Sequence, residues 1–266
     1  MIKLFLSISL LFSFLDLCAM KIDRVILASD DNPEYLQFWP LVAKAWEQLI
    51  GVKPTLFLIA DESVEVDTTV GEVIRFLPIP GMKTSYQAQV IRIIAPAFFE
   101  DEISIISDID TLPINRNYFI KSVSSVLDDC HAVYRNNYDK DGLRYPLCYH
   151  AVKGSVCREV FGLDYIDQSV VREKLIEWEA YGFGWQTDEL VLTAALKKWN
   201  IKSGRVVLLN LGPGRHIDKI DWQYDKDKVV SKYVGAHLPR PFNRHKKRIM
   251  RLVKDLGINY TVETSF

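Results

Sequence analysis

Two aspartates, Asp108 and Asp110, close a short apolar run over residues 103–110 that has the length and composition of a buried strand. Carboxylates at such a place are costly unless a positive group neutralises them, because burying an unpaired charge costs several kcal/mol or more. A hard divalent cation with oxygen ligands meets that need, and such cations often accompany substrate phosphates. The run therefore predicts a strand that ends at a cation and phosphate site. A turn in which the aspartates cap backbone amides is the competing interpretation.

The apolar segments around this run predict a parallel sheet covered by helices, because strands and helices alternate along the chain. Strands are expected at 25–28, 55–59, 73–77, 103–106, 132–134, 148–152 and 206–209, and helices at 36–50, 86–99, 169–179 and 187–199. Ligands of open α/β sheets gather at the carboxyl ends of strands, and Asp30 and Asp108 both lie at such ends. The two positions support a functional role for the aspartate pair.

One continuous domain is expected, since the 266 residues are 48% hydrophobic and no repeat or linker divides them. We expect this domain over 20–240, with an apolar leader at 1–19 and a basic segment at 241–266. The leader resembles a signal peptide or a short anchor. Met20 directly precedes the first strand, so the leader can also be an artefact of start-site choice. A start at Met20 predicts a cytoplasmic or membrane-associated protein, and a genuine leader predicts the secretory pathway or a membrane anchor.

Charge and cysteine content exclude some partners. The net charge of −1 provides no global field that attracts nucleic acid, so we expect no nucleic-acid partner. The four cysteines show no Cys-x-x-Cys spacing and support neither a disulfide framework nor a zinc site. Basic residues gather near the C-terminus, which is typical either of a solvated helix face or of peripheral attachment to an anionic membrane. They are Arg240, Arg244, Lys246, Lys247, Arg248, Arg251 and Lys254.

Several motifs of phosphate-handling enzymes are absent from the sequence. It has no Gly-x4-Gly-Lys-Ser/Thr loop, no Gly-x-Gly-x-x-Gly after the first strand and no Gly-x-Ser-x-Gly elbow. The aspartate pair also partly fits the aspartate-nucleophile phosphatases, in which an apolar strand is followed by the motif Asp-x-Asp-x-Thr. Leu112 holds the threonine position here, and that motif is expected in the first strand rather than the fourth. The phosphatase interpretation is therefore disfavoured.

The helix at 86–99 followed by a strand and Asp108-Ile109-Asp110 resembles the GT-A class of nucleotide-sugar glycosyltransferases, in particular its family-8-like, glycogenin-type branch. The resemblance covers about residues 22–240 in element order. It implies a Rossmann-like α/β domain with a central mostly parallel or mixed sheet flanked by helices. It also implies that Asp108 and Asp110 hold Mn²⁺ or Mg²⁺, which clamps the donor diphosphate and acts on it as a Lewis acid.

The same resemblance implies a third metal ligand, a histidine near the end of the catalytic region. His237 fits this role, because Gly235 permits a close backbone approach in its loop. His216 is the rival ligand. Arg215 and Arg240 are the nearby candidates to meet phosphate oxygens.

An acid at the start of the helix at 187–199 is the candidate catalytic residue. Such an acid favours the helix dipole and caps amides in any protein. The resemblance implies that it faces the acceptor or the donor sugar, and that it is the general base in inverting members. We expect Asp188 rather than Glu189 in this role. The aromatic residues of the preceding loop, at 181–185, are expected either to form a platform for an acceptor sugar or to pack in the core.

The remaining donor contacts are expected at two places, according to the resemblance. Ala28, Ser29 and Asp30 correspond to the place where the nucleotide base and ribose sit. Lys83 and Arg92 are expected near the diphosphate or near the aspartate pair, with Asp108 completing this set.

The resemblance thus implies a metal-dependent glycosyltransferase of hexosyltransferase type. It would move a sugar from a nucleotide-diphosphate-sugar donor to a hydroxyl of a glycan, lipid or protein acceptor. A sugar-phosphate nucleotidyltransferase is one alternative, although its glycine-rich loop after the first strand is missing. A non-catalytic binding or membrane-associated domain of the same fold is the other. The donor sugar, the base, the acceptor, the stereochemical course and the oligomeric state are not specified by the sequence.

Overall fold

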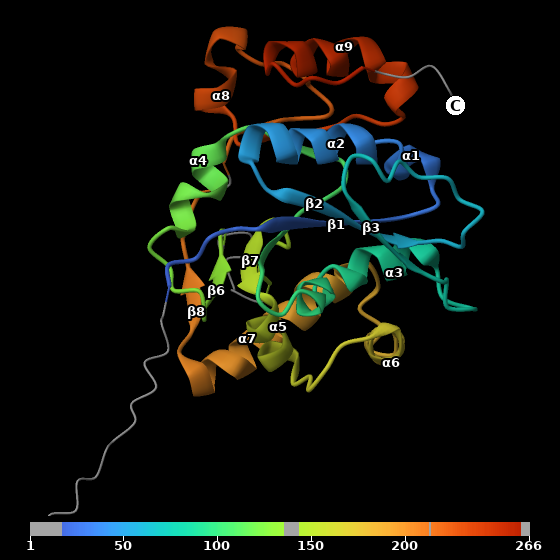
Figure 1. Cartoon of the computed structure of the whole chain (residues 1–266), viewed down its shortest axis with the longest axis vertical. Helices are drawn as coiled ribbons and strands as arrows, with labels where there is room; N and C mark the ends of the chain where they lie inside the picture. The colour runs from blue at the N-terminus through green and yellow to red at the C-terminus, as the bar shows by residue number, and fades with distance from the viewer. Residues whose placement is uncertain (1–17, 136–143, 213, 262–266) are drawn as a thin grey trace, which may run out of the picture.

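The computed structural model describes residues 18–135, 144–212 and 214–261, and a mixed seven-stranded sheet forms its centre (Figure 1). The spatial order of the strands is β3-β2-β1-β4-β7-β6-β8, and β7 runs antiparallel to both of its neighbours. The bounds are β1 Arg24–Asp30, β2 Lys53–Ile59, β3 Glu72–Phe76, β4 Ile103–Ile106, β6 His131–Val133, β7 His150–Lys153 and β8 Val206–Leu208. The predicted α/β fold with a mostly parallel central sheet is confirmed.

Helices cover both faces of this sheet. One face carries α1 Pro33–Leu36, α2 Trp39–Ala45, a π-helical turn at Trp46–Ile50, α4 Arg116–Phe119, α8 Val229–Lys232 and α9 Phe242–Asp255. The other face carries α3 Thr84–Ile91, α5 Gly154–Phe161, α6 Gln168–Glu179 and α7 Thr187–Ser203. The side chains of β1 show how the two cores are separated. Val25 and Leu27 lie in one core, and Ile26 and Ala28 lie in the other, as the two-residue period of a strand requires.

Two expected helices are interrupted at prolines. A proline lacks the amide hydrogen of a helical residue, and its ring clashes with the carbonyl group four residues earlier. Helix α1 ends at Leu36, four residues before Pro40, and α2 starts afresh at Trp39. The helix expected at 86–99 ends at Ile91, and a 3₁₀ turn at Ala95–Phe98 contains Pro96. The helical spacing of apolar residues therefore located these segments correctly, but it predicted one continuous helix where the structure has a break.

A second, three-stranded sheet lies at the carboxyl end of β4. It consists of β5 Thr111–Pro113, β10 Gly235–His237 and β9 His216–Ile217, in the order β5-β10-β9. Strands of two or three residues are too short to show a periodic pattern, so the sequence did not predict this sheet. Its antiparallel register sets His237 opposite Thr111, directly after the second aspartate of the pair.

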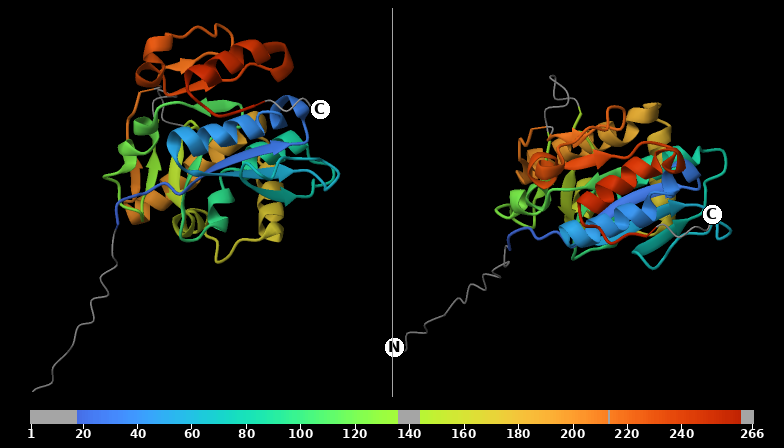
Figure 2. Two further views of the ribbon diagram at one scale, coloured as in Figure 1. Left: turned by 45° about the horizontal axis from the view of Figure 1, so that its top comes forward. Right: turned by 90° about the horizontal axis from the view of Figure 1, so that it is seen from above.

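The basic C-terminal segment packs on the domain through α9, which lies beside α2 (Figures 1 and 2). Phe242, Ile249, Leu252 and Val253 form its buried face. The ring of Phe242 meets that of Phe38 edge-on, with 6.1 Å between the ring centroids. Segment 241–261 is therefore continuous with the core beneath α2.

The expected leader lies almost entirely outside the described residues, which begin at Cys18. Met20 is buried, and its amide donates to the carbonyl oxygen of Val126 at 2.6 Å. Within the described ranges, no helix is both long and apolar enough to cross a membrane.

We predict that Gly235→Ala destabilises the protein by about 1–3 kcal/mol, a cost typical of overpacking. A Cβ at this position would lie 2.9 Å from the carbonyl oxygen of Leu112 and 3.3 Å from Cδ2 of His216, so β5 and β10 would have to move apart. Urea unfolding measures the loss. Gly212→Ala is the control, because its Cβ would meet nothing within 4 Å. Equal stability of the two variants would contradict the prediction.

Candidate metal and donor site

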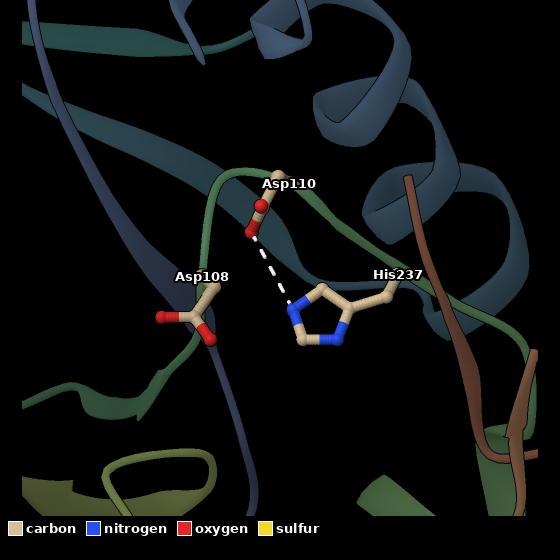
Figure 3. A group of neighbouring side chains, drawn as sticks. All are labelled: Asp108, Asp110 and His237. Carbon is tan, nitrogen blue, oxygen red and sulfur yellow. Dashed lines mark ion pairs between the residues drawn. The ribbon is translucent and has the colours of Figure 1, made fainter. Parts of the chain in front are cut away.

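Asp108, Asp110 and His237 converge at the junction of the two sheets (Figure 3). Each offers one ligand atom, and these atoms all lie within 4.8 Å of one another. The turn between β4 and β5 carries both aspartates, and His237 ends β10. A hydrogen bond of 2.8 Å from the amide of Leu238 to the carbonyl oxygen of Asp110 fastens the two segments together. The local pairing of β5 with β10 thus builds a three-residue group from positions more than a hundred residues apart.

This group has the donor atoms of a hard or borderline divalent cation, two carboxylates and one imidazole. The side chain of His237 is 40% exposed, so a ligand can reach it from solvent. The rival histidine, His216, lies on β9 and is not part of the group. Burial, helped by the charge of Arg135, lowers the pKa of His216 to about 4.

Arg92 links the aspartate pair to Asp188. Its buried guanidinium forms an ion pair with Asp108, and Nη2 lies 3.3 Å from Oδ2 of Asp188. It also donates to the carbonyl oxygens of Ser107, at 3.3 Å, and Gln89, at 3.1 Å. Burial opposes the positive charge, but the two carboxylates outweigh it and raise the pKa of Arg92. Arg92 is therefore a permanent cation that holds two acids in place.

The two aspartates of the pair differ in their electrostatics. Burial raises the pKa of Asp108, but Arg92 and the Cys148 thiol, which donates to Oδ2 at 3.0 Å, bring it below its ordinary value. Burial and the neighbouring charge of Asp108 raise the pKa of Asp110. Its nearest cationic group, Nε of Arg240, is 3.8 Å from Oδ2. Asp110 is therefore the carboxylate whose charge is least compensated, and an added cation would stabilise it most.

Asp188 lies in the first turn of α7, where it is 3% exposed. Its Oδ1 accepts from its neighbour's amide, that of Glu189, at 2.8 Å and from Nε2 of Gln89 at 3.2 Å, while Oδ2 faces Arg92. Burial raises its pKa. The neighbouring acid, Glu189, points instead to Arg144, with 3.5 Å between Oε2 and Nη1. Of the two acids, only Asp188 is thus connected to the aspartate pair.

The expected nucleotide-binding residues occupy the end of β1, next to β4. Asp30 is buried, and its Oδ2 accepts from the hydroxyl of Thr84 at 2.9 Å. The hydroxyl of Ser29 donates to the carbonyl oxygen of Asp30 at 2.9 Å, and the side chain of Ala28 is part of the core. Lys83 is exposed and directly precedes α3. These positions share one edge of the sheet with Asp108.

Three contacts of this site escaped the sequence analysis: the thiol of Cys148 on Asp108, the amide of Gln89 on Asp188 and the hydroxyl of Thr84 on Asp30. Gln89 precedes Arg92 by three residues, which is the spacing of neighbours on a helix face and could have indicated a shared role. Cys148 carries no such signal, because it reaches Asp108 only through the pairing of β7 with β4.

Comparison with known proteins gives a structural likeness only. No protein-family model matches the chain, and no curated protein matches it in sequence. Among solved structures, the galactosyltransferase LgtC in complex with donor and acceptor sugar analogs matches with a TM-score of 0.49 and 11% identity, over 91% of this chain and 98% of LgtC. An active-site mutant of LgtC matches with a TM-score of 0.46 and 12% identity, over 90% of this chain and 98% of the mutant.

We predict that Arg92→Met costs about 3–5 kcal/mol of stability near neutral pH, because it leaves the buried carboxylate of Asp188 without its counter-ion. It also removes the ion pair with Asp108, whose side chain is only partly buried. Without Arg92, the folded-state pKa of Asp108 is expected to rise above its unfolded value, and that of Asp188, which burial already raises, is expected to rise further. Protons then bind the folded state preferentially, so the variant loses stability as the pH rises from the unfolded-state pKa of the two carboxyl groups to their folded-state pKa. The wild-type Asp108 behaves oppositely, because its lowered pKa contributes stability that is lost as the pH falls.

The deficit of Arg92→Met is therefore expected to shrink between about pH 7 and about pH 4.5. Urea unfolding at several pH values measures it. Arg172→Met, on the exposed side of α6, is the matched control and should stay within about 0.5 kcal/mol of wild type. A deficit that is constant with pH would show that lost packing, rather than unpaired charge, is the cause.

Proposed function

We propose that this protein is a metal-dependent glycosyltransferase that uses a nucleotide-diphosphate sugar as donor and a hydroxyl group as acceptor. The observation that carries the proposal is the convergence of Asp108, Asp110 and His237 within 4.8 Å at the carboxyl end of β4. The apolar strand and aspartate pair that resemble the GT-A class supply two of these three groups. The poorly compensated charge of Asp110 is the physical reason for a cation to bind there.

The donor is proposed to lie along the carboxyl ends of β1 and β4. A divalent cation, Mn²⁺ or Mg²⁺, when held by Asp108, Asp110 and His237, supplies Lewis-acid stabilisation of charge on a leaving diphosphate. Arg240, beside Asp110, can donate to a phosphate oxygen. Asp30 is proposed to bind the nucleoside end of the donor, and Lys83 the diphosphate.

Asp188 is proposed to act at the sugar end of the donor. Arg92 and Gln89 hold its carboxylate, which fixes its orientation relative to the aspartate pair. A fixed carboxylate with a raised pKa suits a residue that contacts the transferred sugar or takes a proton from the acceptor.

We predict that a nucleotide-sugar donor stabilises the protein in a metal-dependent way. A panel of UDP-, GDP-, CMP- and dTDP-sugars, each with and without Mn²⁺, is compared by thermal shift. A donor at 100 times its Kd should add about 2.7 kcal/mol to the free energy of unfolding. Asp110→Asn should abolish the effect of Mn²⁺, and Asp164→Asn, an exposed acid away from the site, should leave it unchanged. No metal-dependent shift with any donor would count against the proposed function.

The same panel separates catalysis from binding alone. If the protein is an enzyme, Mn²⁺-dependent hydrolysis of the stabilising donor is expected, and it should be lost in Asp110→Asn. If donor binding persists but no hydrolysis or transfer is detected, the non-catalytic alternative is favoured.

We further propose that α9 attaches the protein to an anionic membrane surface. Arg244, Lys247, Arg251 and Lys254 are all exposed, and their spacing of three and four residues places them on one face of the helix. None of the four forms an ion pair within the described part of the chain. The opposite face is buried against the domain, so the free face of α9 is basic. Each basic residue near an anionic surface contributes about 1 kcal/mol.

We predict that the protein sediments with phosphatidylserine-containing vesicles and not with neutral phosphatidylcholine vesicles, and that salt weakens the binding. Changing the four α9 residues to glutamine should release the protein. A control that changes four exposed basic residues elsewhere to glutamine should retain binding, although the net charge is the same. These control residues are Lys121, Arg172, Lys198 and Lys202. Equal binding of the two variants would argue against a specific role of α9.

A further inference from the structure

Three buried polar groups without partners gather beside the metal site. They are Nε of Arg135 and the hydroxyls of Tyr118 and Tyr149, and none of these atoms has a hydrogen-bond partner in the described part of the chain. Nearly all buried polar groups of folded proteins are hydrogen-bonded, and each exception calls for an explanation such as an absent ion or ligand. Three neighbouring exceptions indicate a site rather than three separate defects.

The topology brings these groups together. Arg135 follows β6, whose carboxyl end lies at the same sheet edge as that of β4, since both strands run antiparallel to β7 between them. The amide of Tyr134 donates to the carbonyl oxygen of Tyr149 at 3.1 Å. The rings of Tyr118 and Tyr149 are 6.2 Å apart, centroid to centroid. The two hydroxyls and the guanidinium thus come from α4 and from the ends of β6 and β7.

Electrostatics agrees with this geometry. Burial raises the pKa of Tyr118 to about 12 and also raises that of Tyr149, and in both cases the charge of Arg135 acts against the rise. The residue before Tyr149 is Cys148, whose thiol lies 3.0 Å from Asp108. The cluster is therefore adjacent to the metal site, yet it shares no residue with it.

The chemistry of the three groups defines what they can bind. A guanidinium only donates hydrogen bonds, and a protonated tyrosine hydroxyl can donate one. Arg135 has no ion-pair partner among the described residues, whereas Arg92 is already engaged by two carboxylates. A ligand that accepts several hydrogen bonds and carries negative charge matches this set, which is the chemistry of a phosphate or a carboxylate.

We propose that Arg135, Tyr118 and Tyr149 form an anion subsite that takes a phosphate or carboxylate group of a substrate. The role of this subsite in a transferase reaction rests on the proposed function, whereas its ability to bind an anion does not. The group can come from two sources: an acidic acceptor, or the diphosphate of the donor. The subsite lies on the side of Asp108 that faces β6 and β7, whereas the proposed nucleoside site lies on the side of β1.

The test uses inorganic phosphate as the probe and calorimetric titration of the whole protein without metal or donor. Phosphate binding is expected to weaken about ten-fold or more in Arg135→Met, because a hydrogen bond to a charged group is lost. It should weaken about three-fold or more in Tyr118→Phe. Arg172→Met, exposed on α6, is the control and should bind phosphate like wild type.

Stability separates a ligand site from a structural one. The Tyr118 hydroxyl makes no hydrogen bond within the described protein, so its removal should leave the urea midpoint unchanged or higher while phosphate binding falls. If phosphate binds wild type, Arg135→Met and Tyr118→Phe equally, or does not bind at all, the proposal is wrong. Either result leaves the donor panel unaffected, so failure of this subsite and failure of the proposed function are distinguishable.

Repeating the phosphate titration in the presence of a saturating donor and Mn²⁺ identifies the source of the anionic group. If phosphate still binds, the subsite belongs to an acidic acceptor. If the donor displaces phosphate, and Arg135→Met also weakens the donor, the subsite holds the donor diphosphate. Both results support the anion subsite and identify what it recognises.

Discussion

The buried guanidinium of Arg92 is the interaction on which the arrangement of the site depends. Arg92 follows α3 and joins it to the two elements that carry its acidic partners. Asp108 lies in the turn after β4, and Asp188 lies at the start of α7. Without a permanent cation, the buried Asp188 and the partly buried Asp108 would each bind a proton more readily, because burial disfavours the charged form of a carboxyl group. Because Arg92 already compensates Asp108, the deficit of positive charge falls on Asp110, and this is where an external cation is most needed.

The pairing of β5 with β10 is the second constraint. It is short, and Gly235 makes it possible, since a larger residue would press on the carbonyl oxygen of Leu112. The register brings His237 next to Asp110. Beyond this pairing the chain enters α9, whose apolar face packs into the same core as α2. The candidate metal ligand His237 and the basic helix are therefore positioned by the same short segment, which joins the candidate site to a surface that we propose meets the membrane.

Much of the fold was predictable because buried strands appear in the sequence as short apolar runs, and amphipathic helices appear as apolar residues at helical spacing. The run that ends at Asp108 is a strand buried on both sides: Ile103 and Ile105 lie in one core and Ile106 lies in the other. The helix breaks near Pro40 and Pro96 could also have been predicted, because proline disrupts a helix. The spacing of apolar residues alone predicted one continuous helix at each place. The three-stranded sheet was not predictable, because strands as short as β9 carry no period and gain their stability only from a partner.

The sequence by itself determined the aspartate pair at the end of a buried strand and the gathering of basic residues near the C-terminus. These are local patterns, set by burial and by helix or strand geometry. Only the tertiary structure decided that His237 rather than His216 joins the aspartates and that Arg92 holds Asp188. It also decided that Arg135 lies with two tyrosine hydroxyls that have no hydrogen-bond partner among the described residues. Those contacts join residues distant along the chain, and their energies depend on register and burial, which no local pattern specifies.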